Sequence, residues 1–162
     1  MLKKLTLCCA LSLLVYNSNS QRYIPDVGLK TLNGESIRSM ELVNQDGFNI
    51  ISFWATWCIP CKKELPDLSL LKSKIKKHNI DVLTISIDTK NIKDQLKFLS
   101  NNAASNLEHF FDIEMKIFKA LKLRGIPTTI IVDQNGLIVS KHEGILKWGE
   151  DEIINKIKSL FY

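Results

Sequence analysis

Two thiols stand two residues apart in the segment Trp57-Cys58-Ile59-Pro60-Cys61. A pair at this spacing can cycle between a dithiol and a disulfide. The preceding residues 50–54 have the composition of a strand, and the residues after Cys61 have the 3.6-residue apolar spacing of a helix. We therefore expect Cys58 at a helix N-terminus, where unpaired N–H groups and the helix dipole stabilise a thiolate. Cys58 is then the attacking sulfur, and Cys61, one helical turn later, is the resolving thiol.

A structural disulfide and a zinc site are the other two roles open to this pair. A disulfide at this spacing closes a very small loop, so it restricts the unfolded chain little. Zinc needs two further ligands. Outside the N-terminal region the candidates for them are His78, His109 and His142, which stand at scattered positions. We therefore expect redox chemistry that needs neither a metal nor an organic cofactor.

The first 20 residues differ from the rest of the chain. They begin with lysines, continue with an apolar stretch over residues 5–16 and end among small serines. This pattern predicts a secretory signal peptide, followed by a domain over residues 21–162. The apolar part is short for a membrane span, and an uncleaved anchor is the alternative. Lipid attachment at Cys8 is disfavoured, because Leu7 precedes it where a small residue is expected.

Removal of residues 1–20 leaves Cys58 and Cys61 as the two remaining cysteines and lowers the formal charge by two from +5. An oxidising compartment favours disulfides. A lone redox pair there is expected to be kept reduced by a dedicated electron donor, or kept oxidised by a dedicated acceptor.

The surplus of lysine does not indicate a nucleic-acid site. The helix after Cys61 has an apolar side at Leu65, Leu68, Leu71 and Ile75, and lysines on its outer side at Lys72, Lys74, Lys76 and Lys77. No aromatic residues alternate with these lysines. We interpret them as a solvated helix face and expect no nucleic acid as a partner.

The chain of 162 residues, 45% of them hydrophobic, is long enough for one domain with a core. The turn Asn33-Gly34 predicts an N-terminal hairpin. The pattern then predicts a strand, a helix, a strand and a helix at residues 50–54, 58–77, 80–88 and 91–100, with Pro66 kinking the first helix. The next predicted elements are a short run at 109–111 and a helix at 113–123 that Gly125 ends. They are followed by a strand hairpin at 126–140 and a helix at 150–160. The βαβα alternation predicts a parallel core to the sheet.

Several separated motifs together resemble the thioredoxin superfamily, and within it the exported TlpA-like and ResA-like thiol-disulfide oxidoreductases. The motifs are residues 53–61 (Phe-Trp-Ala-Thr-Trp-Cys-Ile-Pro-Cys), Glu64-Leu65-Pro66, residues 124–128 (Arg-Gly-Ile-Pro-Thr) and the turn at 133–136. The resemblance covers essentially residues 21–162. It implies an α/β, thioredoxin-like fold, with a central mixed sheet flanked by helices, an N-terminal β-hairpin and a central strand-helix insertion over residues 81–106.

The resemblance also implies how a substrate is bound. Pro127 is expected to be cis and to face the disulfide, so that Ile126-Pro127 offers backbone groups to an extended substrate segment. Trp57, Ile59, Pro60 and Ile126 are expected to flank the thiols as an apolar binding surface. Trp54 and Trp148 are instead expected to fill the core and to pack near the last helix.

One departure from thioredoxin concerns a buried carboxylate. Thioredoxin carries it six residues before the first cysteine, where this chain has Ser52. Glu64 matches an acidic active-site residue of ResA-like proteins and would serve Cys61 as a proton relay if it points inward. A solvated acid that stabilises the first helical turn is the equal alternative.

The resemblance implies a disulfide reductase of protein substrates, located in the periplasm or on the outer face of the cytoplasmic membrane of a bacterium. Apocytochrome c or its maturation partners are candidate substrates, and a membrane protein of the DsbD or CcdA kind is the candidate electron donor.

Three alternatives stay open. The first alternative is an oxidase or isomerase. Ile126 before the proline favours a reductase, but Ile59-Pro60 does not decide the direction of electron flow. A peroxiredoxin-like peroxidase is disfavoured by Ala55, where that class has threonine, and by the closeness of Cys61 to Cys58. A non-catalytic adaptor is the third.

Overall fold

Strand β3 (Phe48–Trp54) lies inside a seven-stranded mixed sheet. The computed structural model describes residues 23–76 and 78–159. The strand order is β2-β1-β5-β4-β3-β6-β7, with β3, β4 and β5 parallel and β6 and β7 antiparallel to their neighbours. The other strands are β1 (Gly28–Lys30), β2 (Ser36–Arg38), β4 (Ile80–Ser86), β5 (Glu108–Phe111), β6 (Thr128–Val132) and β7 (Ile138–Glu143). The predicted mixed sheet is confirmed.

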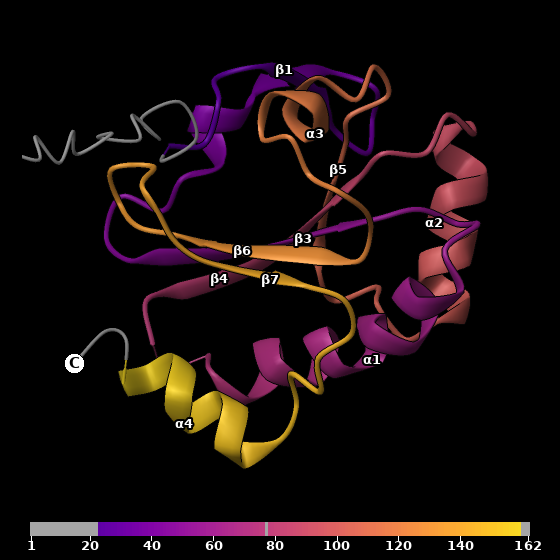
Figure 1. Ribbon diagram of the computed structural model, residues 1–162. Helices are drawn as coiled ribbons and strands as arrows, with labels where there is room; N and C mark the ends of the chain where they lie inside the picture. The colour runs from indigo at the N-terminus through magenta and orange to yellow at the C-terminus, as the bar shows by residue number, and fades with distance from the viewer. Residues whose placement is uncertain (1–22, 77, 160–162) are drawn as a thin grey trace, which may run out of the picture.

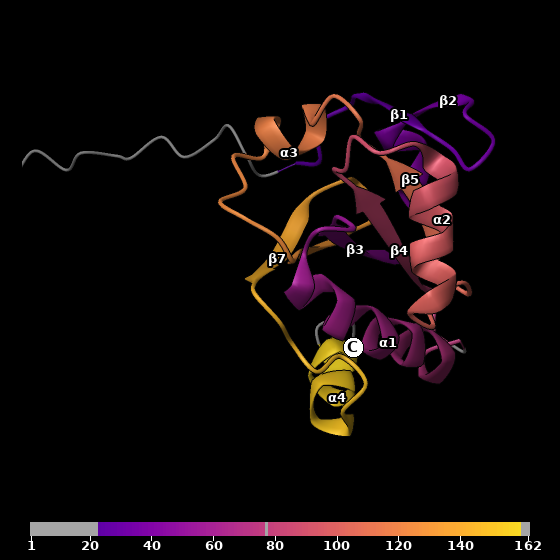
Figure 2. The ribbon, with the colours of Figure 1, turned by 90° about the vertical axis from the view of Figure 1, so that its right-hand side faces the viewer.

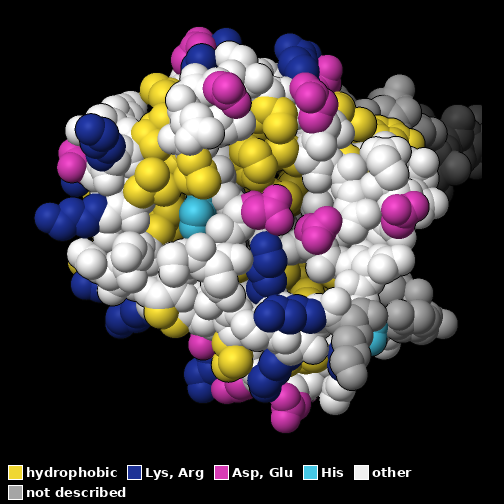
Figure 3. Space-filling view, turned by 180° about the vertical axis from the view of Figure 1, so that it is seen from behind, with side chains coloured by type: hydrophobic (Ala, Val, Ile, Leu, Met, Phe, Trp, Pro, Cys, Tyr) yellow, Lys and Arg dark blue, Asp and Glu magenta, His cyan; other side chains and the backbone are white. Residues whose placement is uncertain are grey.

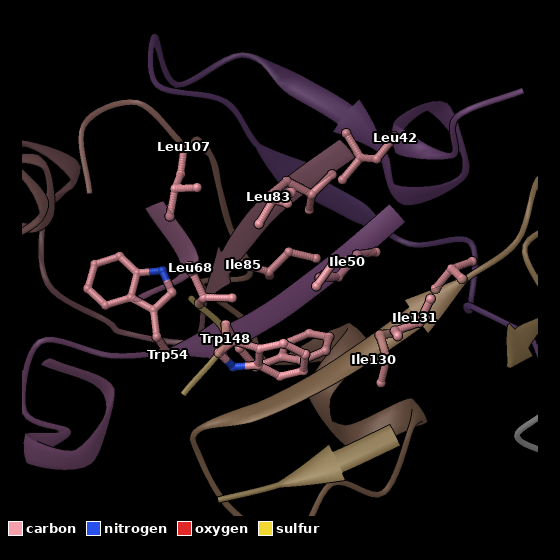
Figure 4. Packing of buried hydrophobic residues seen from close by; sticks show 14 of the residues in the cluster. Leu42, Ile50, Trp54, Leu68, Leu83, Ile85, Leu107, Ile130, Ile131 and Trp148 are labelled. Atoms are coloured by element: carbon pink, nitrogen blue, oxygen red, sulfur yellow. The ribbon is translucent and has the colours of Figure 1, made fainter. Parts of the chain in front are cut away.

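Helices cover both faces of this sheet (Figures 1 and 2). α1 (Ile59–Lys74), α2 (Ile92–Asn101) and α4 (Asp151–Ser159) lie on one face, and the short α3 (Lys116–Ala120) lies on the other. A 3₁₀ turn, Ser39–Leu42, follows β2. Figure 4 shows part of the buried cluster, in which side chains of β3, β4 and β6 lie together with Leu68 of α1 and with Trp148.

The N-terminal hairpin forms as the sequence predicts. β1 and β2 pair antiparallel around a turn in which Gly34 has a φ of +82°, a conformation that favours glycine. β1 also pairs with β5, through Lys30 and Phe111. The hairpin therefore extends the sheet beyond its parallel core.

A row of polar residues, one from each of five adjacent strands, crosses the sheet in register. Residues paired in register point to the same face of a sheet. The row, called the polar row below, consists of His109, Thr84, Ser52, Thr129 and His142. The first four are buried. The polar row lies on the face that α1 covers, because the hydroxyl of Ser52 contacts Glu64 of that helix.

The predicted helix over residues 113–123 is wrong in length. The observed α3 has five residues and ends before Leu121, not at Gly125. Its start is fixed because the carboxylate of Asp112 accepts hydrogen bonds from the N–H groups of residues 116, 117 and 118. Its end is fixed because Lys122 turns into the left-handed region, at φ +48°.

Smaller differences concern the ends of other elements. α1 ends at Lys74, whereas the prediction extended it to Lys77, a residue outside the described part of the chain. β7 continues to Glu143, three residues beyond the prediction, because it pairs with β6 along the whole length of that strand. β4 and α2 occupy the segment predicted as the insertion, and β4 lies inside the sheet between β3 and β5.

The predicted signal peptide, with Cys8 and Cys9, lies outside the described residues. Among residues 23–76 and 78–159, no helix is long and apolar enough to cross a membrane. Figure 3 shows basic and acidic side chains intermixed on the face opposite to that of Figure 1, so that face is not a continuous basic surface.

Candidate active site

The two thiols of the predicted pair form a disulfide at the start of α1. Their Cα atoms are 5.3 Å apart, and Cys58 is the N-cap residue of the helix. The Sγ atom of Cys58 accepts a hydrogen bond from the N–H of Cys61, at 3.1 Å. Cys58 is 4% exposed and Cys61 is 1% exposed. The predicted placement is thus confirmed. The sulfur atom of the N-cap residue accepts a hydrogen bond from an N–H group of the first helical turn that has no partner within the helix.

The turn that carries Cys58 is braced by the end of the neighbouring strand. The carboxylate of Asp88 accepts hydrogen bonds from the N–H and hydroxyl of Thr56, at 2.9 and 2.5 Å. The N–H of Ile87 donates to the carbonyl of Trp54, at 2.9 Å. Burial acts to raise the pKa of Asp88, but the hydrogen bonds from Thr56 and Lys90 hold it below its usual value. Asp88 therefore stays ionised and holds the turn.

Sequence reasoning did not identify Asp88 as part of the site. The one available signal was an acidic residue two positions after the end of β4, since parallel strands present functional side chains at their carboxyl ends.

Apolar side chains next to the disulfide are open to solvent. Trp57 is 63% exposed, Ile59 is 72% exposed, and Pro60 is also exposed. Large apolar groups on a surface mark contact sites when they gather. Trp54, in contrast, is buried and stacks on Phe98 at a ring-centroid distance of 5.5 Å, so its expected role in the core is confirmed.

Ile126-Pro127 has the expected cis peptide bond and leads into β6. Because β6 runs antiparallel to β3, with Thr128 paired to Phe53, this dipeptide lies at the end of the sheet where β3 leads into the cysteine turn. The carbonyl of Pro127 accepts a hydrogen bond from the N–H of Gly144. Within the described part of the chain, no hydrogen bond uses the N–H or carbonyl group of Ile126.

Glu64 points inward. Its side chain is 1% exposed and accepts hydrogen bonds from Trp148 Nε1 at 2.7 Å, from the N–H of Leu146 at 3.2 Å and from the hydroxyl of Ser52 at 3.5 Å. The alternative of a solvated acid is therefore wrong. Burial raises the pKa of Glu64, and these three hydrogen bonds act in the opposite direction.

Trp148 is a site residue that sequence reasoning missed. The prediction of packing near the last helix is correct, since the ring is buried directly before α4. Its hydrogen bond to Glu64 joins residues 84 positions apart. No local signal indicates such a contact.

The three histidines do not come together. His109 is buried and bonds to Thr84 and to the carbonyl of Ala104, whereas His142 is half-buried beside Trp148. Among the described residues, no cluster of three histidine, cysteine, aspartate or glutamate side chains is arranged to hold a metal ion.

Comparison with known proteins matches residues 21–141 to the model of the AhpC/TSA family. The chain is 29% identical over 116 residues to the thiol-disulfide oxidoreductase ResA of Halalkalibacterium halodurans, covering 72% of this chain and 64% of that protein. It is 30% identical over 129 residues to the thiol:disulfide interchange protein DsbE homolog of Paracoccus denitrificans, covering 77% and 66%. The chain thus spans slightly less than two thirds of these two relatives.

Solved structures include a similar chain, a thioredoxin-like protein of Porphyromonas gingivalis. It is 30% identical, with a TM-score of 0.69, and the match covers 88% of this chain and 94% of that one.

Proposed function

The chain belongs to the AhpC/TSA family, and we propose that it is an exported thiol-disulfide oxidoreductase that reduces disulfides in other proteins. The observation that carries the proposal is the disulfide at the N-terminus of α1, with exposed apolar side chains at Trp57 and Ile59 beside it. A structural disulfide would not need an apolar surface around it. The two relatives named for thiol-disulfide chemistry support the same activity.

In the proposed reaction, the reduced protein attacks with the thiolate of Cys58. A bond forms between Cys58 and one substrate sulfur, and the other substrate sulfur leaves as a thiolate that takes a proton. Cys61 then loses its proton to Glu64 and attacks Cys58, which releases the second substrate sulfur as a thiolate that takes a proton. The protein ends as the Cys58–Cys61 disulfide, and the substrate ends with two thiols. A thiol or dithiol donor must return the two electrons.

The apolar surface and the backbone at the cis proline are the proposed substrate site. Trp57, Ile59 and Pro60 would contact apolar substrate side chains, and the N–H and carbonyl groups of Ile126, beside Pro127, would pair with an extended substrate backbone. Main-chain pairing of this kind is largely independent of sequence. It would allow several proteins to serve as substrates.

The biological setting is proposed from the sequence. The predicted signal peptide over residues 1–20 and the resemblance to exported TlpA-like and ResA-like proteins support an extracytoplasmic location, the periplasm or the outer face of a bacterial cytoplasmic membrane. We propose apocytochrome c or its maturation partners as substrates, and a membrane electron donor of the DsbD or CcdA kind.

The reduction potential tests the direction of electron flow. Purified protein is equilibrated with dithiol and glutathione buffers, and its thiols are counted by alkylation. A value near the roughly −270 mV of thioredoxin supports a reductase, whereas a value near the roughly −120 mV of DsbA assigns an oxidase. Insulin reduction should be lost in Cys58→Ser, and Cys61→Ser should accumulate the mixed disulfide. A pair that does not equilibrate with either buffer would reject redox function and favour an adaptor.

A further inference from the structure

The loop between β7 and α4 supplies two of the three hydrogen bonds that reach Glu64. The indole Nε1–H of Trp148 and the backbone N–H of Leu146 both donate to Oε1, at 2.7 and 3.2 Å. The hydroxyl of Ser52, in the middle of the polar row, lies 3.5 Å from Oε2. The carboxyl group of Glu64 is therefore held between the loop on one side and the sheet on the other.

The loop is fixed against α1 by more than these contacts. The ammonium group of Lys74 donates to the carbonyl of Gly149 at 2.8 Å. Gly149 lies so close to α1 that a Cβ atom added there would be 2.6 Å from a methyl group of Leu70. His142 meets the ring of Trp148 edge-on, at 6.1 Å and 90°. Trp148 is thus a buried side chain with a defined position.

The two oxygens of Glu64 have different kinds of partner. Oε1 faces two N–H groups, which can only donate, so it acts as an acceptor in both protonation states. Oε2 faces a hydroxyl group, which can donate to a carboxylate or accept from a carboxylic acid. The proton of Glu64 therefore belongs on Oε2. Cys61 lies three residues earlier on α1, on the same side of the helix.

We infer that Trp148 is a positioning residue, which holds Oε1 and leaves Oε2 as the oxygen that takes the proton of Cys61. The inference rests on the proposed function, in which Glu64 is the proton acceptor. In that step the S–H bond of Cys61 breaks and an O–H bond forms on Oε2. The resulting thiolate forms the bond to Cys58, and the electron pair of the mixed disulfide leaves with the substrate sulfur.

Other titratable groups surround this site. Cys58 and Cys61 lie at the start of α1, and Asp67 lies one turn after Glu64 and acts to raise its pKa. His142 of β7 meets the ring of Trp148 edge-on, and Lys147 of the loop is paired with Glu150. From β3 the contact is the hydroxyl of Ser52. Burial raises the pKa of Glu64, and the bond from Trp148 is the strongest influence that lowers it.

Trp54 provides a matched control. Both tryptophans belong to the buried cluster (Figure 4). Among the described residues, Nε1 of Trp54 has no hydrogen-bond partner. Trp148→Phe and Trp54→Phe therefore delete the same atoms from a buried site, but the first alone removes a hydrogen bond to Glu64.

The first experiment measures the pH dependence of mixed-disulfide resolution in a single turnover. In Trp148→Phe the midpoint of the acidic limb should rise by about one pH unit, since a hydrogen bond to a charged group is lost. Trp54→Phe should keep the wild-type midpoint. In the Glu64→Gln background, Trp148→Phe should cause no further shift. Equal shifts in the two phenylalanine variants, or a shift that persists without Glu64, would overturn the inference.

The second experiment uses the wild-type protein and needs no turnover. In ¹⁵N-resolved spectra, the indole signal of Trp148 should follow the titration of the Glu64 carboxyl group, and the signal of Trp54 should not. If the signal follows Glu64 but the protein reduces no disulfide, the proposed function fails and the contact stands. If the protein reduces disulfides and the signal of Trp148 does not respond, the positioning role is rejected.

Discussion

Glu64 shows how a buried acid can be provided by a different element from the one expected. The strand position that carries a carboxylate in thioredoxin is Ser52 in this chain, and the carboxyl group of Glu64 reaches that hydroxyl from α1. A carboxylate without solvent is unfavourable unless donors surround it. Trp148, Leu146 and Ser52 provide those donors. The acid is therefore tolerated, at an expense in stability that depends on pH.

The stability of Glu64→Gln tests whether the buried carboxylate of Glu64 destabilises the folded protein. Because the folded pKa of Glu64 lies above its ordinary value of 4.5, the folded chain holds a proton that the unfolded chain releases. Stability present below 4.5 is thus lost as the pH rises through the folded pKa. Glutamine does not ionise and keeps an acceptor for Trp148. We expect the variant to be more stable than the wild type at pH 8, and to resolve the mixed disulfide more slowly.

The measurement is urea unfolding of the oxidised protein at pH 4 and pH 8. Glu152→Gln, at an exposed position of α4, is the control and should change stability by less than about 0.5 kcal/mol. A Glu64→Gln variant that is less stable than the wild type at pH 8 would contradict the assignment.

At the scale of elements, His109 joins β5 to β4 and to the loop after α2. Its Nε2 atom lies 3.0 Å from the carbonyl of Ala104, which can only accept, so the proton is assigned to Nε2. Nδ1 then accepts the hydroxyl proton of Thr84, at 2.7 Å. Desolvation lowers the pKa of His109 to about 4. The neutral ring is therefore a structural part of the polar row and fixes the packing of these strands.

The low pKa of His109 predicts that the folded protein loses stability in acid. The unfolded histidine binds a proton near pH 6.5 and the folded one only near pH 4, so its contribution to stability is complete above 6.5 and is lost as the pH falls toward 4. We expect about 3 kcal/mol of unfolding free energy to be lost over this range. The difference should be much smaller in His109→Gln.

Chemical unfolding between pH 7 and pH 4 measures this loss, with His142→Gln on the edge strand as the matched control. A wild-type curve that runs parallel to that of His109→Gln would show that this histidine does not control acid stability.

At the scale of the whole molecule, the fold does not by itself separate a disulfide reductase from a peroxidase. Peroxiredoxins share the fold, the insertion and the N-terminal hairpin. The difference lies in the cysteine turn, where Ala55 stands in place of a threonine and Cys58 already pairs with Cys61 across two residues. Architecture therefore gives the class of scaffold, and the site gives the reaction.

Peroxide turnover provides the test at this scale. We expect the reduced protein to consume hydrogen peroxide no faster than free cysteine does. Ala55 stands at the position of the peroxidase threonine, and the hydroxyl of the neighbouring Thr56 donates to Asp88. The assay follows peroxide loss in the presence of a thiol reductant, with Cys58→Ser as control. Rapid turnover that depends on Cys58 would reassign the protein as a peroxidase.

The sequence by itself determined the features that depend on neighbouring residues. Four elements were predicted because their signals lie close together in the sequence. They are the strand before Cys58, the helix after it, the turn at Asn33-Gly34 and the hairpin at residues 133–136. The cis bond before Pro127 followed from the family resemblance. The secretory signal also rests on local pattern and stays a prediction.

Only the tertiary structure decided which distant groups meet. Asp88 reaches Thr56 across 32 positions, and Trp148 reaches Glu64 across 84. The shortening of α3 likewise depends on Asp112, which is buried against the rest of the fold. Burial converts these polar groups into partners, because an unpaired polar atom away from water is unfavourable whereas an exposed one is not. Which distant polar groups are buried together depends on the packing of the sheet and helices, so local sequence patterns do not indicate these pairs.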